Sequence, residues 1–291
     1  MQLFDRLKSL LPSNRLNVSK RFVLLHEAVS GTMSNFYQAR DRQTNQVVGL
    51  KILDAKKTAA VEARLRGLNK PSEGDIAMQL RHPRIVETLE YGVTTNGSPY
   101  LVMEFLEGPN LNTVLMVRDA CLDGRRGRYI LEAAEAVAAV HEAGFLHRDI
   151  CPRNLMLTNQ REDLKLIDFG LTVPAKPEFM QPGNRTGTPN YMAPELVRRR
   201  ATDQRVDVFS LGVTAYEICT FELPWPRGRG DGMAAMSHDR PPVDIATYRP
   251  QIHPALAKAI HACIEPDVNK RCPTIDAFLR MVRNIPESGD R

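Results

Sequence analysis

The chain has 291 residues, of which 43% are apolar and 25% are charged, and its net charge is +5 at pH 7. This length and apolar content suffice for one large or two modest hydrophobic cores. No apolar run approaches the roughly 18–20 residues of a membrane-spanning helix, so no membrane span is expected. The mild basic excess favours acidic partners or nucleotides without naming one.

The five cysteines are scattered along the chain and form neither a CxxC pair nor a Cys/His cluster with metal-ligand spacing. An odd count with this scatter suits a reducing compartment. Residues 1–11 form a short amphipathic stretch that contains Asp5 and lacks the apolar core of a signal peptide. These features predict a cytoplasmic protein.

The first part of the chain is rich in β-prone apolar runs. Strands are expected at residues 22–25, 36–39, 47–53, 85–92 and 100–105. Residues 58–80 have the composition of a helix that is interrupted at 70–73, where Ser72 is a possible N-cap. The small lobe of the protein is therefore expected to be β-rich.

After Gly108 the apolar residues recur at helical spacing. Helices are expected near residues 128–143, 207–220, 254–264 and 275–282, and short strands near 155–157 and 164–167. Residues 174–190 form a loop rich in Pro, Gly and Asn. The predicted organisation is a small β-rich lobe and a larger, mostly helical lobe, joined near residues 104–108.

One segment of the helical part concentrates polar chemistry. It reads His147-Arg148-Asp149-Ile150-Cys151-Pro152-Arg153-Asn154, and Asp168-Phe169-Gly170 follows it. Two carboxylates and a carboxamide at this spacing are able to hold a hydroxyl and a divalent metal beside a phosphate. The pattern closely resembles the catalytic loop and the metal-binding loop of eukaryotic-type (Hanks-type) protein kinases, and the sequence as a whole is Ser/Thr kinase-like.

This resemblance covers nearly the whole chain and implies an α+β, two-lobed protein kinase fold. The implied bounds are 1–20 for an N-terminal lead-in, 21–104 for the N-lobe, 105–287 for the C-lobe and 288–291 for a C-terminal tail. The implied activity is transfer of the γ-phosphate of ATP to Ser or Thr hydroxyls of a protein substrate, with Mg²⁺ as the metal.

The resemblance also implies roles for single residues. Asp149 would orient the substrate hydroxyl, and Asn154 and Asp168 would hold Mg²⁺, because oxygen ligands suit that ion. Lys51 would bind the α- and β-phosphates of ATP and would be held by a Glu on the next helix. Counting back from residues 82–86, that Glu is Glu73; Glu62 is the alternative.

The catalytic loop departs from the Ser/Thr kinase pattern at Cys151, where the family has a Lys that contacts the transferring phosphate. A neutral thiol cannot replace that charge. Arg153 stands where tyrosine kinases carry an Arg, so Arg153 is predicted to supply the cation, because a guanidinium binds phosphate bidentately. A surface Arg without this role is the alternative, and Cys151 stays open as an oxidation-sensitive site.

The phosphate-covering loop is where the resemblance is thinnest. The three glycines of the family fall on Val29, Gly31 and Ser34, so only Gly31 is retained. Glycine matters in this loop because the backbone must approach phosphate closely. This loop is therefore expected to bind phosphate less tightly than is usual in the family.

The positions that match the family pattern indicate which residues would form the adenine pocket. Phe36 and Gly49 stand where the family has Val and Ala above the ring, and Met156 would lie below it. Two hypotheses remain, because Phe36 either stacks on the base in space vacated at Gly49 or fills the pocket and blocks nucleotide. The hinge that meets the adenine edge would run from Glu104 to Leu106, with Met103 at the rear of the pocket.

Residues 186–195 resemble the end of a Ser/Thr kinase activation segment. Thr188 would meet Asp149, which argues for Ser/Thr substrates, and Thr186 is a candidate phosphorylation site because Arg148 offers a cation. Alternatively, Arg148 is satisfied by a carboxylate or by water. Two structural contacts are also implied, an ion pair of Glu195 with Arg271 and bonds from Asp207 to the catalytic-loop backbone.

Two other functions stay open. A pseudokinase that acts as a binding or scaffold module is suggested by Cys151, Ser34 and Val29, although the residues for metal and proton chemistry are all present. A small-molecule kinase is less consistent with the segment 193–195. The Arg-rich stretches 125–128 and 198–200 lack interleaved aromatic residues, so no nucleic-acid site is expected. Arg229-Gly230-Asp231 matches the adhesion tripeptide by letter only.

Overall fold

The computed structural model describes residues 15–26, 29–31, 33–63, 67–183, 185–225, 238 and 240–285. Residues 1–11, the tripeptide 229–231 and the tail 288–291 lie outside these ranges. Backbone contacts divide the chain into two compact units, one of residues 1–69 and 88–105 and one of residues 70–87 and 106–291. The predicted lobe bounds at 20/21, 104/105 and 287/288 stay a prediction.

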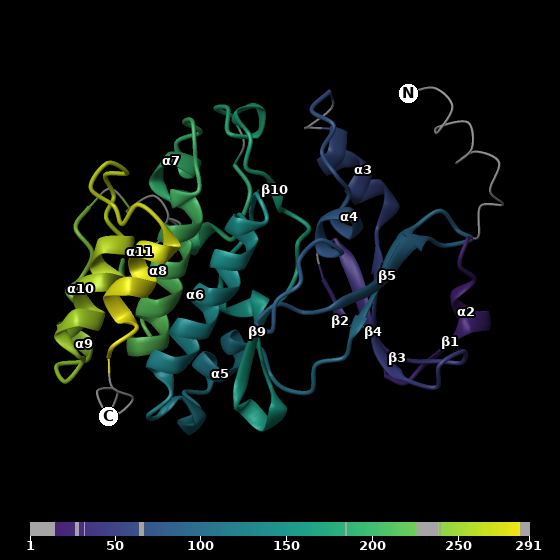
Figure 1. Ribbon diagram of the computed structural model, residues 1–291, viewed down its shortest axis with the longest axis horizontal. Helices are drawn as coiled ribbons and strands as arrows, with labels where there is room; N and C mark the ends of the chain where they lie inside the picture. The colour runs from purple at the N-terminus through teal and green to yellow at the C-terminus, as the bar shows by residue number, and fades with distance from the viewer. Residues whose placement is uncertain are drawn as a thin grey trace, which may run out of the picture. The chain divides into compact units, whose positions relative to one another are not determined.

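The first unit is built on an antiparallel sheet (Figure 1). Its strands are β1 (Phe22–Leu24), β2 (Val29–Ser30), β3 (Ser34–Asp41), β4 (Val47–Leu53), β5 (Thr88–Val93) and β6 (Pro99–Glu104), and its helices are α2 (Val18–Arg21) and α3 (Ala55–Ala63). The strand order is β1-β3-β4-β6-β5, and β2 pairs with β3. The predicted strand 85–92 begins only at Thr88, because Ile85 instead bridges Leu166 in the second unit.

Alternation along the strands gives this sheet two different faces. Successive strand residues point to opposite sides, so Val48 and Leu50 of β4 face one side, while Gly49 and Lys51 face the other. The first side holds a hydrophobic core, which consists of Leu16, Phe22, Ala39, Val48, Leu50, Tyr100 and Val102. The second side carries the residues that the sequence connects with nucleotide binding.

The second unit is mainly helical (Figure 1). Its helices are α4 (Glu73–Ala77), α5 (Leu111–Met116), α6 (Arg126–Glu142), α7 (Pro194–Val197), α8 (Arg205–Thr220), α9 (Ile245–Tyr248), α10 (Pro254–Cys263) and α11 (Ile275–Val282). Two short antiparallel pairs accompany them, β7 (Phe145–Leu146) with β10 (Val173–Pro174), and β8 (Leu155–Thr158) with β9 (Asp163–Leu166). The predicted helices near 207–220, 254–264 and 275–282 are confirmed.

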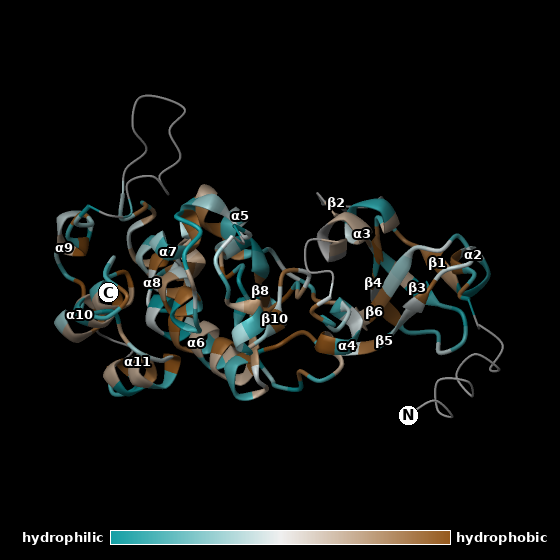
Figure 2. Cartoon of the chain, turned by 90° about the horizontal axis from the view of Figure 1, so that it is seen from above, coloured by the Kyte–Doolittle hydropathy of each residue, from teal (hydrophilic) through white to brown (hydrophobic). Residues whose placement is uncertain are grey.

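Burial follows helical periodicity in this unit. Hydrophilic and hydrophobic residues interleave along α11 (Figure 2), and its buried residues are Ile275, Phe278, Leu279 and Val282. This i, i+3, i+4, i+7 spacing places them on one face. In contrast, α8 is buried along nearly its whole length, as expected for the central helix of a core. None of the helices in the described ranges has both the length and the apolar character needed to cross a lipid bilayer.

The predicted helix 58–80 is two helices, α3 and α4, because the segment at Lys70-Pro71 does not continue the first. Ser72 caps α4 as expected. Its Oγ accepts the N–H of Asp75 at 3.1 Å, and the Asp75 carboxylate accepts the N–H of Ser72 at 3.1 Å. The following residues run alongside β9, since the N–H of Leu166 donates to the carbonyl of Arg84. This contact explains why α4 belongs to the second unit.

Together these two units form the predicted α+β fold, with a small β-rich lobe and a larger helical lobe.

Candidate active site

Asp207 of α8 anchors the catalytic loop, residues 147–154. The main-chain N–H groups of His147 and Arg148 donate to the two carboxylate oxygens of Asp207, each at 2.8 Å, and His141 Nε2 lies 2.9 Å from the same carboxylate. Burial alone would raise the pKa of Asp207, but the hydrogen bond and charge of His141 and the main-chain donors hold that pKa below its ordinary value. The predicted role of Asp207 is confirmed.

Asp149 projects from this loop and is half-buried. Its Oδ2 accepts a hydrogen bond from Nδ2 of Asn154 at 3.0 Å. Its Oδ1 accepts hydrogen bonds from the N–H and the hydroxyl of Thr188, at 2.8 and 2.7 Å. The predicted meeting of Thr188 with Asp149 is therefore confirmed. The carboxylate is fixed in one orientation by groups from the catalytic loop and from the activation segment.

Thr188 reaches this position because Gly187 allows a close approach. Gly187 has φ of +122°, and a Cβ there would lie 2.7 Å from the carbonyl oxygen of Arg148. Any other residue would be strained in this conformation and would collide with the catalytic loop. The sequence Thr186-Gly187-Thr188 thus brings a hydroxyl to Asp149 by way of a glycine.

Arg153 and Cys151 flank the same hydroxyl. Arg153 is exposed, and its Nη2 donates to Thr188 Oγ1 at 3.0 Å. Cys151 is 1% exposed, with Sγ 3.6 Å from Thr188 Oγ1. Burial, and then the charge of Asp149, raises the pKa of Cys151 to about 11. A buried and protonated thiol is a poor nucleophile, so the structure does not support Cys151 as an oxidation-sensitive site.

The two predicted metal ligands come from neighbouring segments of the second unit. Asn154 is buried, and its Nδ2 donates to Asp149, to the carbonyl at 2.8 Å and to the carboxylate at 3.0 Å. Its Oδ1 is then the atom suited to a cation. The N–H of Ile167 donates to the Asn154 carbonyl at 2.9 Å, which places the next residue, Asp168, close to Asn154.

Asp168 adopts φ of +66°, which is unusual for a residue with a Cβ. Its Oδ1 accepts the N–H of Gly170 at 3.1 Å. A Cβ at Gly170 would lie 3.3 Å from Asp168 Oδ1 and 3.4 Å from Glu73 Oε2. The carboxylates of Glu73 and Asp168 therefore both lie beside Gly170.

These donors fit Mg²⁺ in chemistry, since carboxylate and amide oxygens are its preferred protein ligands. Within the described ranges, no group of three or more His, Cys, Asp or Glu side chains could hold a metal by itself. A cation bound by Asn154 and Asp168 would therefore need phosphate oxygens and water to complete its coordination.

In the first unit, Lys51 lies in the interior of the sheet. It pairs with Phe36 on β3 and with Leu101 on β6, and only 8% of it is exposed. A Lys at this burial is uncommon unless its charge is compensated, so Lys51 is not a solvated strand residue. Its pairing with Glu73, which lies in the other unit, stays a prediction. The side chain of Glu62 lies outside the described part of the chain.

Phe36 and Gly49 share one space on the face that carries Lys51. A Cβ at Gly49 would lie 2.8 Å from Cζ of Phe36 and 3.0 Å from Cγ of Met103. The phenyl ring thus occupies the volume that a larger residue at 49 would fill. This agrees with the expectation that Phe36 uses the space vacated at Gly49. Whether the ring stacks on a base or blocks it stays open.

The predicted phosphate loop is the hairpin turn between β2 and β3. The N–H of Gly31 donates to the carbonyl of Ser34 at 2.8 Å, and a Cβ at Gly31 would lie 3.3 Å from that oxygen. Val29 pairs with Phe36 in this hairpin, although its side chain lies outside the description. A side chain at residue 31 would therefore be in tight contact with the carbonyl of Ser34.

The predicted hinge residues fall in both units. Glu104 ends β6 and pairs with Val48, while Leu106 is buried in the second unit. Met156 lies half-buried on β8, opposite Lys165. Sequence reasoning missed Gly108, which has φ of +156° and whose Cβ would collide with the carbonyl oxygen of Leu157. The signal in the sequence that could have identified this position is the glycine itself, which stands two residues after Leu106.

Arg148 has a partner in the main chain of the activation segment. Its Nη2 donates to the carbonyl of Phe179, and that a carboxylate or water also satisfies this side chain stays a prediction. The guanidinium is buried, and burial lowers its pKa. Glu195 and Arg271 form the expected ion pair, with Nη1–Oε1 at 2.6 Å and Nη2–Oε2 at 3.0 Å. Phosphorylation of Thr186 stays a prediction.

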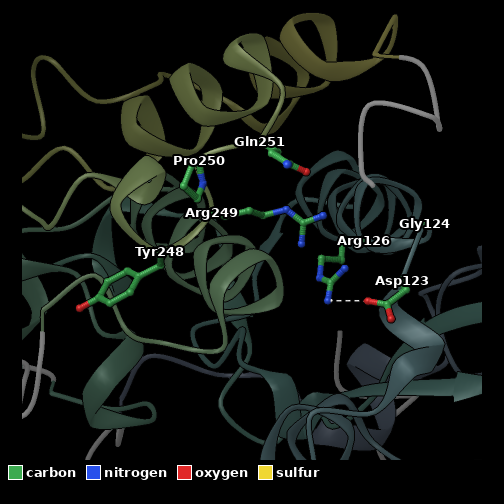
Figure 3. A pocket seen from close by; sticks show the side chains of 7 residues that line it. All are labelled: Asp123, Gly124, Arg126, Tyr248, Arg249, Pro250 and Gln251. Atoms are coloured by element: carbon green, nitrogen blue, oxygen red, sulfur yellow. Dashed lines mark hydrogen bonds and ion pairs between the residues drawn. The ribbon is translucent and has the colours of Figure 1, made fainter.

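A separate pocket of about 640 Å³ lies at the other end of α6 (Figure 3). It is lined by Asp123, Gly124, Arg126, Tyr248, Arg249, Pro250 and Gln251. Arg126 donates to Asp123 at 3.0 Å and to the carbonyl of Ile218 at 3.1 Å. Since α6 has 17 residues and rises about 1.5 Å per residue, this pocket is remote from Asp149 and contributes nothing to the catalytic loop.

The fold and the Asp149 site define a protein kinase, and comparison agrees. Residues 24–281 match the model of the protein kinase domain family, so the chain belongs to that family. A protein kinase domain implies ATP, a protein substrate and typically a divalent metal.

Curated relatives include several kinases. The chain is 28% identical over 258 residues to Serine/threonine-protein kinase pkn3 of Myxococcus xanthus, covering 85% of this chain and 47% of that protein. It is 33% identical over 238 residues to Hormonally up-regulated neu tumor-associated kinase homolog B of Xenopus laevis, covering 81% and 37%. It is 36% identical over 187 residues to Hormonally up-regulated neu tumor-associated kinase of Homo sapiens, covering 62% and 25%. The chain thus spans less than half the length of these three relatives.

Proposed function

We propose that the chain is an active protein kinase that transfers the γ-phosphate of ATP to Ser or Thr hydroxyls of a protein substrate and depends on Mg²⁺. The observation that supports this most is the orientation of Asp149 by Asn154 on one side and Thr188 on the other. A carboxylate held in this way is ready to accept a hydrogen bond from a substrate hydroxyl.

The metal role falls to Asn154 and Asp168, whose oxygens suit Mg²⁺. When bound, the ion would neutralise negative charge on the phosphates. Lys51 and Glu73 would position ATP from the two lobes. Gly31, Phe36, Gly49, Glu104, Leu106 and Met156 would surround the nucleotide.

Arg153 is the proposed cation at the transferring phosphate. It is exposed beside Thr188 Oγ1, at 3.0 Å, and therefore lies close to the carboxylate that would receive the acceptor hydroxyl. Cys151 is buried and neutral and cannot perform that task. An arginine at this place provides bidentate donors in a planar fork, which match two phosphate oxygens.

Specificity for Ser and Thr is supported by Thr188, because its hydroxyl and N–H both bind Asp149, the contact that the resemblance to Ser/Thr kinases implies. The names of the relatives agree, as one of them is a serine/threonine kinase. All five cysteines are free thiols, which supports a reducing compartment such as the cytoplasm.

A pseudokinase that works as a scaffold is the second candidate, and one observation favours it. The Phe36 ring fills the space at Gly49 on the sheet face that carries Lys51. If the ring stays there, nucleotide would be excluded even though Asp149 is correctly placed.

The test is a phosphate-transfer assay with the full chain, labelled ATP and three matched peptides that differ only in a Ser, Thr or Tyr acceptor. We expect transfer to Ser and Thr peptides, little to Tyr, and loss of transfer when EDTA removes the metal. ATP binding without transfer to any acceptor would support the scaffold function instead.

A further inference from the structure

The pocket at the N-terminal end of α6 is lined by side chains that the proposed phosphate transfer does not use. Its volume of about 640 Å³ lies in the range of roughly 300–1,000 Å³ that holds small organic ligands. Two of its lining residues, Arg126 and Arg249, are cationic, and one, Asp123, is acidic. The two arginines reach the pocket from different segments of the chain (Figure 3). The lining residues therefore carry an excess of one positive charge.

The last turn of α8 brings the two guanidinium groups together. Nε of Arg126 donates to the carbonyl of Ile218 at 3.1 Å, and Nη1 of Arg249 donates to the carbonyl of Cys219 at 3.2 Å. These carbonyls belong to consecutive residues at the end of the helix, so both cationic groups lie within reach of one ligand. The negative end of the helix dipole offsets only part of their charge.

The side chain of Arg126 is fixed in place by further contacts. Only 5% of the residue is exposed. Its Nη2 donates to the carboxylate of Asp123 at 3.0 Å, and its Nη1 donates to the carbonyl of Leu122 at 3.4 Å. Its guanidinium carbon lies 5.3 Å from the centroid of the Phe221 ring. A side chain held in this way has little conformational freedom left to lose, so a ligand pays little to order it.

The acidic residue of the pocket does not cancel both arginines. The Asp123 side chain is 71% exposed, so solvent and salt screen its repulsion of an anion. Each guanidinium presents its donors in a planar fork that matches two oxygens of a phosphate or a carboxylate. Two forks at one pocket suit a group with three oxygens and two negative charges better than they suit a carboxylate.

The other side of the pocket suits an organic group. Tyr248 is 42% exposed, and Pro250 next to Arg249 is exposed as well. Both residues line the pocket, and their rings offer apolar surface beside the two cationic groups. A ligand that combines a phosphoryl group with a carbon skeleton would therefore contact both kinds of surface.

We propose that this pocket binds a phosphate monoester. Its phosphoryl oxygens would accept hydrogen bonds from Arg126 and Arg249, and its organic part would lie against Tyr248 and Pro250. A phosphoserine side chain of a protein and a free small-molecule phosphate ester share this chemistry. The site lies apart from Asp149, and the proposal does not depend on phosphate transfer by the chain.

Calorimetric titration of the full chain without ATP tests the proposal. The probes are O-phospho-L-serine, a phosphoserine peptide, the same peptide with Ser, and inorganic phosphate. We expect both esters to bind, with an affinity that falls as salt is added, and the Ser peptide not to bind. Tighter binding of the phosphopeptide would indicate a protein ligand, and equal binding of both esters a small one, and either result supports the site.

Two results of this titration would overturn the proposal. The first is that neither ester binds. The second is that inorganic phosphate binds as tightly as both esters, because the organic part would then contribute nothing.

Variants at Arg249 test the role of the guanidinium groups. Arg249→Gln should weaken the binding of both esters by at least about tenfold, as expected for a hydrogen bond to a charged group. Arg249→Lys keeps the charge without the fork and should retain part of the affinity. The matched control is Arg200→Gln, because Arg200 is an exposed arginine that does not line the pocket. Equal weakening by Arg249→Gln and Arg200→Gln would contradict a specific site.

Hydrogen–deuterium exchange of the wild type locates the ligand without any substitution. Saturating phosphoserine peptide should slow the exchange of residues 122–126 and 248–251 and leave residues 147–154 unchanged. Slower exchange in residues 147–154 alone would place the phosphoryl group at the catalytic loop and overturn the proposal. This measurement holds even if a variant at Arg249 fails to fold.

Discussion

The phenyl ring of Phe36 and the missing side chain of Gly49 occupy the same volume, since a Cβ at residue 49 would lie 2.8 Å from Cζ of Phe36. The two residues are diagonal neighbours on β3 and β4, since Phe36 pairs with Lys51 and Gly49 pairs with Gln38, and they share the side of the sheet that carries Lys51. This relationship decides whether the small lobe has room for a nucleotide.

Gly49→Ala is expected to destabilise the protein by about 1–3 kcal/mol, because the added methyl overpacks the site. In a Phe36→Val background the same change should cost much less, since the ring is gone. Urea unfolding of the four proteins in this double-mutant cycle measures the coupling. Equal costs of Gly49→Ala in both backgrounds would show that the two residues do not share the space.

The same variants distinguish the two hypotheses for Phe36, that its ring stacks on the base or that it blocks nucleotide binding. If the ring stacks on a base, ATP should raise the Tm of the wild type, and Phe36→Val should weaken that shift. If the ring blocks the pocket, the shift should be absent in the wild type and present in Phe36→Val. We expect the first pattern, because a proposed active kinase has to bind ATP.

Arg153→Ala should lower kcat by about 10²-fold, the usual cost of losing one donor to a transition-state oxygen. Arg153→Lys should retain part of the activity, and Cys151→Lys in the Arg153→Ala background should restore part of it. Steady-state kinetics with a Ser peptide measure these effects. Arg200→Ala, which removes another exposed arginine, is the control, and an unimpaired Arg153→Ala enzyme would remove Arg153 from the proposed mechanism.

Arg271→Met should lower the free energy of unfolding by about 3–5 kcal/mol, because it leaves a buried carboxylate unpaired. The Arg271 side chain is 0% exposed and that of Glu195 is 9% exposed. Denaturant unfolding checks this value. The neighbouring Lys270→Met is the matched control, since the Lys270 side chain is 75% exposed, and a comparable loss in that variant would contradict a specific role for the ion pair.

Asp207 should make stability depend on acid pH. Its folded-state pKa is lowered, so the ionised carboxylate stabilises the fold fully above the unfolded pKa of about 3.9. That stabilisation is lost as the pH falls through the folded pKa. Asp207→Asn should therefore cost about 2–3 kcal/mol at pH 7 and progressively less below pH of about 4.

Unfolding of the wild type and Asp207→Asn at several pH values between neutrality and the acid limit checks this dependence. A difference that stays constant over the whole range would show that the charge of Asp207 is not the stabilising feature.

Much of the helical unit could be predicted from the sequence. The helices near 207–220, 254–264 and 275–282 follow from periodicity alone, and the bonds of Asp207, Glu195 and Thr188 follow from motif order. These contacts lie within one lobe and depend on side chains whose chemistry admits few partners, so residue type was informative.

Other features depend on tertiary contacts that a local pattern does not contain. Ile85 looks like a strand residue, but it bridges Leu166 instead of joining β5. Arg148 donates to a main-chain carbonyl, a partner that residue type does not predict. The burial of Cys151, which makes its thiol inert, depends on how the catalytic loop packs and not on its neighbours in sequence.

The most direct measurement of the central proposal is labelled phosphate transfer from ATP to a Ser peptide by the wild type and by Asp149→Asn. The Asn side chain keeps the shape of the site and removes the proton acceptor. We predict that the wild type exceeds Asp149→Asn by about 10²–10⁴-fold, as expected for loss of a general base. Equal transfer by the two proteins, at the level of the buffer, would contradict kinase activity and leave the chain as a scaffold.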